Sequence, residues 1–314
     1  MLKPLAALIL LTSTTAAWGQ STRGGAAEEK RAVPDGPEAS DSNGAPLSPA
    51  QLYQSLESAR IVYLGEHHDR WADHQLELRV VRRLHPDAVG MEMFQRPFQD
   101  VLNRFSRHRL EEPGLREEAQ WQKRWGFPWR FYWPIVEAAR EDGDDLLALN
   151  TPAEVTHKVA RQGLSSLSGD DLRWIPPIDQ IQLGPDGYRK QMRAIFAEHS
   201  PHPDRAAPTT PTGPTNGIPG SSEQSFARFF EAQVLWDETM AASVADYAIA
   251  HPGARIVVVV GAGHIEGRVG IPDRVARRLE ARHMAPRQVT VLLNPDDAHG
   301  AADYALRLAN WVGP

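Results

Sequence analysis

The sequence contains no cysteine among its 314 residues. This absence excludes disulfide bonds, thiolate metal sites, iron–sulfur clusters, covalent c-type haem attachment and a cysteine nucleophile. Any metal or cofactor must therefore be held by nitrogen and oxygen ligands.

Long apolar segments and concentrated positive charge are also missing. The apolar run near the N-terminus, Leu5–Leu11, is too short to span a bilayer. The formal net charge is −6, and lysine and arginine are scattered among the acidic residues, so nothing indicates nucleic-acid binding. The hydrophobic content of 41% is sufficient for a substantial core, in one large domain or two smaller ones.

Residues 1–19 have the pattern of a signal peptide. Lys3 supplies the positive end, Leu5–Leu11 the apolar region, and Ala17 and Gly19 the small residues before a cut at Gln20. We therefore expect an exported protein, periplasmic or extracellular. No cysteine follows the apolar region, so we do not expect a lipoprotein. An apolar N-terminus that is not cleaved is the alternative interpretation.

Composition divides the rest of the chain. Residues 20–49 are rich in glycine, alanine, serine and proline and predict a flexible linker. One α/β domain is expected over residues 50–298, followed by a C-terminal tail or short helix at 299–314. The polar, proline-rich stretch at 200–222 predicts a disordered surface loop.

Strand and helix patterns alternate along this domain. Continuous valine, isoleucine and leucine runs separated by helical patterns predict a mainly parallel sheet flanked by helices. The expected strands are Ile61–Gly65, Val89–Met93, Leu146–Asn150, Arg255–Gly261 and Gln288–Leu293, and the expected helices are Ala72–Leu84, Pro97–Arg107, Ile135–Glu141 and Pro272–Arg282. Residues 151–250 carry no strand pattern and predict a helical cap.

Polar side chains follow three of these strands. Glu66 and His68 come after the first, where an extended backbone places alternate side chains on one side and directs His67 away. Asp69 is expected to cap the next helix or to orient an imidazole. Ligands of parallel α/β sheets bind beyond the carboxyl ends of the strands, so these residues are candidates for a site. A polar strand-to-helix turn is the structural alternative.

Glu92 and His264 follow two other strands. A carboxylate between Met91 and Met93 is costly to bury alone, so Glu92 should pair with a metal, a basic side chain or backbone N–H groups. A salt bridge to Arg96 or to another arginine is the structural alternative. His264 follows a glycine-rich turn that allows a close approach to a ligand. Together with Glu66 and His68 they form a set of possible metal ligands.

Aromatic residues are concentrated between residues 121 and 133, where tryptophan recurs every four positions. This density is typical of core packing, and the alternative is a wall for a flat apolar ring. In that case Tyr132 could ligate ferric iron through its phenolate, with Tyr188 and His74 as other candidates. Gln233 and Asp237, four apart on one helix face, would by themselves be an ordinary solvated stripe.

Several separated motifs resemble the ChaN-like haem-binding family, which belongs to a superfamily with the Tiki and TraB proteins and the erythromycin esterases. The motifs, in order, are Gly65–Asp69 with His74, Gly90–Met93, Trp125–Trp129 with Tyr132 and Pro134, Gln233 with Asp237, and Gly261–His264 with Gly270–Pro272. The resemblance aligns the family histidine with His68 and raises Asp237 to a site candidate. Members are typically envelope lipoproteins associated with iron or haem uptake, so this chain departs by lacking the lipobox cysteine.

Two functions are compatible with these residues. The resemblance implies an exported protein that holds haem at the strand ends and exchanges it with haem-transport components of the envelope. This protein could form a homodimer. The residues expected to hold the haem are Glu66, His68, Asp69, His74, Glu92, Tyr132, Gln233, Asp237 and His264. The alternative is a metal-dependent hydrolase of peptides or esters, in which Glu66, His68, Glu92 and His264 hold Zn, Mn or Fe.

Overall fold

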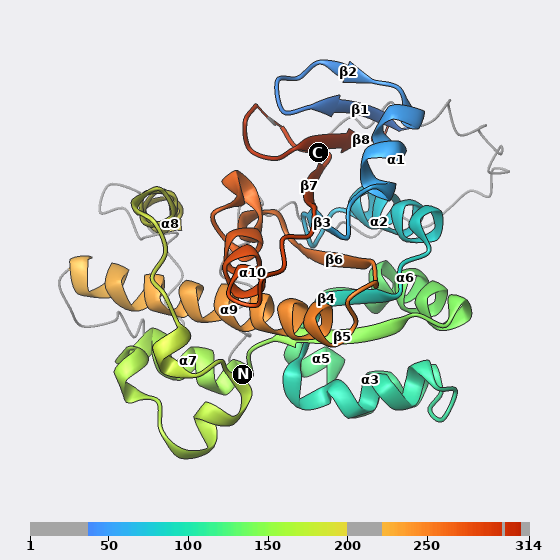
Figure 1. Cartoon of the computed structure of the whole chain (residues 1–314). Helices are drawn as coiled ribbons and strands as arrows, with labels where there is room; N and C mark the ends of the chain where they lie inside the picture. Colours follow the sequence, from blue (N-terminus) through green and yellow to red (C-terminus); the bar gives the residue numbers. More distant parts are fainter. Residues whose placement is uncertain (1–36, 200–221, 297–298, 309–314) are drawn as a thin grey trace, which may run out of the picture.

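A computed structural model describes residues 37–199, 222–296 and 299–308, and these form an α/β structure around an eight-stranded sheet with the strand order β2-β1-β8-β7-β3-β6-β4-β5 (Figure 1). The predicted fold class is therefore confirmed. The predicted signal peptide and nearly all of the predicted loop at 200–222 lie outside the described residues. No helix in the described part of the chain is long and apolar enough to cross a membrane.

The five strands predicted from the sequence form the parallel centre of the sheet. They are β3 (Ile61–Glu66), β4 (Ala88–Gln95), β5 (Asp145–Asn150), β6 (Ile256–Gly261) and β7 (Gln288–Leu293). β6 lies between β3 and β4, and Glu66 is paired in register with Gly261. The carboxyl ends of β3, β6 and β4 are therefore neighbours.

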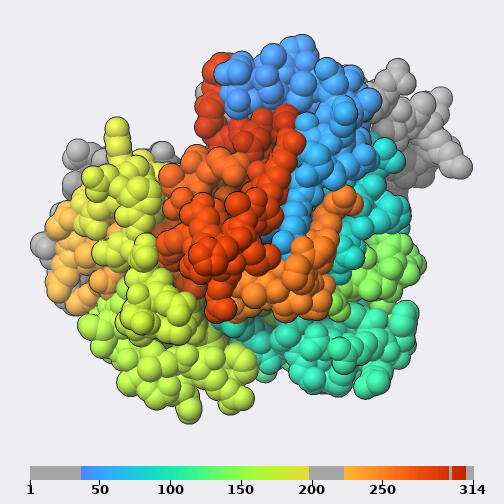
Figure 2. All heavy atoms as spheres, viewed as in Figure 1, coloured from blue at the N-terminus to red at the C-terminus, as the bar shows by residue number. Residues whose placement is uncertain are grey.

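One edge of the sheet was not predicted. β8 (Tyr304–Arg307) runs parallel to β7, and β1 (Glu38–Asp41) pairs antiparallel with both β8 and β2 (Pro46–Leu47). The prediction of a linker over residues 20–49 is wrong from Glu38 onward, and the predicted tail contains a strand. β1 and β8 pair with each other from opposite ends of the chain, and β2 is only two residues long, so these strands lack a clear local pattern. Figure 2 shows the blue N-terminal residues packed beside the red C-terminal ones.

Helices cover both faces of the sheet, as strands buried on both sides require. Val62 and Leu64 face a core shared with α1 (Pro49–Glu57), α2 (Trp71–Leu84), α3 (Gln99–Ser106) and α6 (Trp129–Asp142). Ile61 and Tyr63 face the opposite core, shared with α9 (Ser222–Ala250) and α10 (Ile271–Glu280). Side chains alternate along a strand, so Glu66 points to the same face as Val62 and Leu64, toward α2 and α6.

The described part of region 151–250 contains helices and 3-10 turns joined by loops, and no strand, in agreement with the predicted helical cap. It contains α7 (Ala153–Gln162), the 3-10 turns η3 (Leu164–Ser166), η4 (Gly169–Trp174) and η5 (Ile178–Gln180), α8 (Asp186–His199) and α9. Phe226 and Phe230 of α9 pack on α8, whereas Met240 and Val244 pack on the sheet. The long helix α9 therefore joins the cap to the sheet (Figure 1).

Shorter helices complete the connections. The predicted helix Pro97–Arg107 is a 3-10 turn, η2 (Arg96–Phe98), followed by α3. The remaining elements are α4 (Glu112–Glu118), α5 (Trp121–Arg124), η6 (Ala262–His264) and η7 (Glu266–Arg268). η6 begins directly after β6, so it positions His264 at the carboxyl edge of the sheet.

Candidate functional site

Four side chains predicted as metal ligands meet at the carboxyl ends of the central strands. Glu66 ends β3, His68 lies in the turn that follows, Glu92 belongs to β4, and His264 ends η6. Each of the four residues has at most 5% of its surface exposed. We call this group of four the crevice.

Glu66 orients His68. One carboxylate oxygen of Glu66, Oε1, accepts a hydrogen bond from His68 Nδ1 and another, of 2.8 Å, from the hydroxyl of Tyr132 on α6. A carboxylate only accepts, so the proton of His68 is on Nδ1. Burial raises the pKa of Glu66, but the charge of His74 and the hydrogen bond from His68 hold it well below its usual range.

His264 is oriented in the same way from the other side of the crevice. Its Nδ1 lies 2.5 Å from Oδ1 of Asp237 on α9, and the hydroxyl of Tyr188 on α8 donates to Asp237 Oδ2 at 2.6 Å. Burial lowers the pKa of His264, but the carboxylates of Glu92 and Asp237 outweigh it and raise the pKa to about 10.

Glu92 lies between the two imidazoles. Its Oε1 is 3.9 Å from His68 Nε2 and 3.5 Å from His264 Nε2, and its Oε2 accepts the backbone N–H of Gly261 at 2.7 Å. Glu92 thus pairs with two histidines and a backbone N–H, as the expectation of a basic side chain or backbone N–H groups allowed, and the alternative of a salt bridge to Arg96 is not observed. Burial raises the pKa of Glu92, and the two histidines together lower it below its usual value.

The Nε2 atoms of both histidines lie near the same oxygen of Glu92, Oε1. These three residues are not a group whose ligand atoms all lie within 4.8 Å of one another, so an ion bound by all three would require the two imidazoles to move closer. A tetrahedral ion with ligand distances of about 2.0–2.2 Å separates its ligand atoms by roughly 3.4 Å. The Nε2–Oε1 separations of 3.5 and 3.9 Å are close to this value. Metal-bound histidines commonly donate their other ring N–H to a carboxylate, as His68 and His264 do here. The donor set therefore suits a divalent transition metal.

A second buried cluster lies behind the crevice. His74 Nδ1 is 3.0 Å from Glu66 Oε2 and 3.0 Å from Glu77 Oε2, while His74 Nε2 is 3.2 Å from the carbonyl oxygen of His68. A carbonyl accepts only, so His74 carries a proton on Nε2 and another toward the carboxylates. Burial lowers the pKa of His74, but the two carboxylates raise it to about 11. Burial and the neighbouring Glu66 raise the pKa of Glu77 well above its usual value.

Ligand atoms of Glu66, His74 and Glu77 lie within 4.8 Å of one another, so these residues could also hold an ion. Sequence reasoning missed Glu77 because a glutamate in an amphipathic helix normally faces solvent. The one local signal is its spacing, three positions after His74 on the same helix. Glu77 is nevertheless completely buried.

Most of the chain matches a known protein family. Residues 52–275 match the family described as "Haem-binding uptake, Tiki superfamily, ChaN". The chain belongs to this family. The predicted resemblance is therefore confirmed.

A solved structure described as "Cofacial heme binding to ChaN of Campylobacter jejuni" has a similar fold. It matches with a TM-score of 0.63 and 17% identity, over 87% of this chain and 97% of that chain. The type III effector HopBA1 matches with a TM-score of 0.44 and 13% identity, over 89% of this chain and 98% of that one, which is too distant to support a functional comparison.

Among curated proteins, "Protein RETICULATA-RELATED 5, chloroplastic" of Arabidopsis thaliana is 26% identical over 263 residues. The match covers 78% of this chain but only 32% of that protein. The chain thus spans about a third of the length of this relative.

The other predicted residues of this ChaN-family chain lie around the crevice. Asp69 is exposed and does not cap α2, whose N-cap is Arg70 without a side-chain hydrogen bond, so the capping prediction is wrong. His67 is partly exposed, and its Nδ1 is 2.9 Å from Asp73 Oδ2. Gln233 is buried one turn before Asp237 on α9, so this face of the helix is not a solvated stripe.

The tryptophan-rich segment contributes both to the core and to the crevice. Trp121 and Trp125 are buried in the core on the α2 and α6 face. The ring of Trp125 packs edge-on against His68, with centroids 4.7 Å apart, and Phe127 lies 5.3 Å from the same imidazole. Core packing therefore accounts for Trp121, while Trp125 and Phe127 also cover His68.

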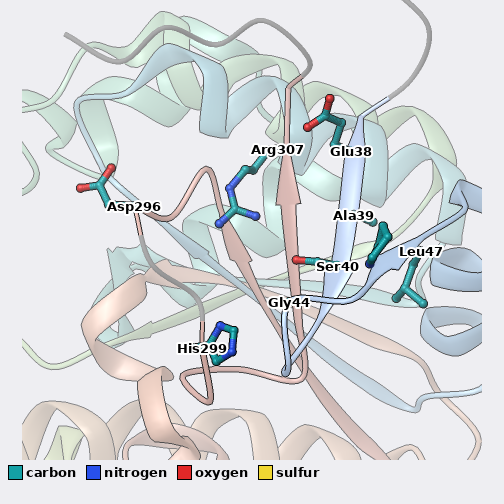
Figure 3. A pocket seen from close by; sticks show the side chains of 9 residues that line it. Glu38, Ala39, Ser40, Gly44, Leu47, Asp296, His299 and Arg307 are labelled. Atoms are coloured by element: carbon teal, nitrogen blue, oxygen red, sulfur yellow. The ribbon is translucent and has the colours of Figure 1, made fainter.

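A hollow of about 540 Å³ lies elsewhere, at the edge formed by β1, β2 and β8 (Figure 3). Its lining includes Glu38, Ser40, His299 and Arg307, and none of the crevice residues. Arg307 donates to the carbonyl oxygen of Pro295, which ties this edge together. This hollow is separate from the predicted site.

Proposed function

We propose that this ChaN-family protein is an exported haem-binding protein of the bacterial envelope that takes part in haem uptake, storage or transfer. The match of residues 52–275 to a haem-binding uptake family carries the proposal. The similar fold of the Campylobacter ChaN structure, which is described as binding heme cofacially, supports it. The signal-peptide pattern of residues 1–19 supports export.

Haem does not fit the crevice in the conformation described. The four crevice residues are at most 5% exposed, so a porphyrin could touch them only after Trp125 and Phe127 moved. Tyr132 is completely buried, and its hydroxyl donates a hydrogen bond to Glu66. Burial and the charges of Glu66 and Glu77 raise the pKa of Tyr132 well above 10, which disfavours the phenolate that ferric iron requires.

The experiment that tests haem binding is a titration of the chain from Gln20 with ferric haem, followed by absorbance. We expect saturable binding with a Soret band distinct from that of free haem. Binding that does not saturate would contradict the proposed function. Size-exclusion chromatography of the same samples tests whether the protein forms a homodimer, and mass spectrometry of exported protein tests cleavage before Gln20.

A metal-dependent hydrolase is the second candidate, and one observation favours it. The Nε2 atoms of His68 and His264 both face Glu92 Oε1, while carboxylates hold their Nδ1 atoms. A metal held by these residues would supply an activated water. Elemental analysis together with ester and peptide substrates tests this candidate. Protein that neither retains nor binds a divalent metal would exclude it.

A further inference from the structure

A small pocket lies at the carboxyl ends of β4 and β5, where Gln95 pairs in register with Asn150. Its volume is about 20 Å³. A polar cavity of roughly 10–15 Å³ already accommodates one water molecule, so this pocket can hold one small polar group. We call it the β4/β5 pocket. Its lining includes Gln95, Trp125, Asn150, Thr151, His157 and Trp236.

Two side chains of the lining carry buried polar atoms that the protein itself does not pair. Oδ1 of Asn150 and the hydroxyl oxygen of Thr151 have no hydrogen-bond partner within the described residues. The two residues are only 6% and 1% exposed. A buried polar atom is unfavourable unless it is paired, so a ligand that pairs with these atoms gains free energy from them.

Hydrogen bonds within the protein set the orientation of the two amides in the lining. Nδ2 of Asn150 donates to the backbone carbonyl of Glu92 at 3.0 Å, so Oδ1 remains as the acceptor. Oε1 of Gln95 accepts the backbone N–H of Ala153 at 3.3 Å, and Nε2 of Gln95 makes no hydrogen bond within the described residues. With the hydroxyl of Thr151, the pocket therefore offers an acceptor, a donor and a group that can be either.

The β4/β5 pocket is close to neutral. None of the described residues in its lining is acidic, and its one arginine, Arg124, pairs with Glu154 at 2.6 Å. Burial lowers the pKa of His157 below its ordinary value of 6.5, so this imidazole is uncharged at neutral pH. An ionised ligand would meet no unpaired charge of opposite sign here. A hydroxyl group, which both donates and accepts, matches the lining.

Two tryptophans connect the pocket with the crevice. The ring centroid of Trp125 lies 4.7 Å from that of His68, and the ring centroid of Trp236 lies 6.4 Å from that of His264. Both tryptophans also line the β4/β5 pocket. A ligand held in the pocket can therefore place an apolar part against the indole rings, beside the histidines of the crevice.

We infer that the β4/β5 pocket binds one hydroxyl group of an uncharged ligand through Gln95, Asn150 and Thr151, and that Trp125 and Trp236 contact the apolar part of this ligand. The pocket is thus a recognition site for alcohols next to the crevice. The inference is independent of the proposed function, because a porphyrin is far larger than this pocket.

The test uses three probes of similar size and different charge, which are isopropanol, isopropylammonium and acetate. Each probe is titrated into the full chain, and binding is followed by the NMR signals of the side-chain amides of Gln95 and Asn150. Thr151→Val removes the hydroxyl and keeps the shape of the side chain. Gln95→Glu keeps the acceptor for Ala153 and removes the donor.

Thr239→Val is the matched control. The hydroxyl of Thr239 is also buried without a hydrogen-bond partner within the described residues, but Thr239 does not line the pocket. The same substitution is therefore made at a site where no ligand is expected.

We expect isopropanol to bind the wild type saturably with a millimolar dissociation constant, a realistic affinity for so small a ligand. Thr151→Val should weaken this binding about fivefold, the loss expected for one neutral hydrogen bond. Gln95→Glu should weaken isopropanol binding and strengthen that of isopropylammonium, because it adds a negative charge. Thr239→Val should bind isopropanol like the wild type.

Three results would overturn the inference. Amide shifts that rise linearly with isopropanol, without saturation, would show a solvent effect and no site. Saturable binding that is unchanged in Thr151→Val would place the site elsewhere. Binding of acetate or isopropylammonium to the wild type as tight as that of isopropanol would exclude selection of an uncharged group. Each of these results leaves the haem titration, and with it the proposed function, untouched.

Discussion

His264 Nδ1 lies 2.5 Å from Asp237 Oδ1, although the two residues are 27 positions apart and belong to different elements. His264 follows the central strand β6, whereas Asp237 is on the long helix α9. Tyr188 of α8 donates to the other oxygen of the same carboxylate. The helical cap thus sets the orientation of a histidine at the edge of the sheet.

Replacing Asp237 should weaken metal binding at the crevice without removing a ligand. We expect Asp237→Asn to lower the affinity for Zn²⁺ about 10- to 100-fold, the usual effect of losing a carboxylate that orients a metal-bound histidine. Isothermal titration calorimetry with Zn²⁺ measures this change. Asp246→Asn, at an exposed position of the same helix, is the control. Equal affinities in the two variants would argue against an orienting role.

Gly261 and Gly263 should respond differently to alanine. A Cβ at Gly261 would lie 3.0 Å from His68 Cε1, whereas a Cβ at Gly263 would have no atom within 4 Å. We expect Gly261→Ala to displace His68 and weaken Zn²⁺ binding, with Gly263→Ala close to wild type. NMR spectra of the histidine side chains would detect the displacement. Unchanged His68 signals in Gly261→Ala would contradict the described geometry.

Tyr132→Phe should destabilise the fold. It removes one of the two hydrogen bonds to Glu66 Oε1 in a completely buried site, which should cost about 1–3 kcal/mol. Urea unfolding measures the loss. Tyr304→Phe is the control, because the Tyr304 hydroxyl makes no hydrogen bond within the described residues. We also expect Tyr132→Phe to bind haem like the wild type, and lost binding would instead support iron ligation by Tyr132.

Stability should fall as the pH rises above neutrality. The folded-state pKa values of His264, about 10, and His74, about 11, are above the ordinary histidine value of 6.5. The folded protein keeps these protons while the unfolded chain loses them above pH 6.5, so the stabilisation is complete below pH 6.5 and disappears as the pH rises toward 10 to 11. The limiting slope is about 1.4 kcal/mol per pH unit for each proton kept.

Urea unfolding at pH 6, 7.5 and 9 checks this dependence. His264→Gln removes one of the two groups and should show a shallower decline than the wild type. A stability that is constant or rises across this range would show that the two histidines are neutral in the folded protein.

The parallel centre of the sheet could be predicted because its strands are buried on both faces. Such strands are continuous apolar runs, as in Ile256–Gly261, and this pattern is local. The edge strands could not be predicted in this way. Ala39 pairs with Leu306, so the structure of residues 38–41 depends on a partner at the far end of the chain.

The candidate site shows the same division. Four site residues could be predicted from their positions at the ends of strands, because parallel strands end at a common edge. They are Glu66, His68, Glu92 and His264. Glu77 was missed, since its burial depends on α6 packing over α2. Asp69 was overvalued, because the chain turns before α2 begins and leaves its side chain in solvent.

The sequence by itself determined the nitrogen and oxygen chemistry of this protein, its parallel strands and its ChaN family, because composition, apolar periodicity and motif order are properties of the chain. Only the tertiary structure decided that carboxylates hold the Nδ1 atoms of His68 and His264, that the crevice is closed, and that Glu77 is buried beside His74. These properties depend on distances between residues far apart in sequence, which are set when α2, α6 and α9 pack on the sheet.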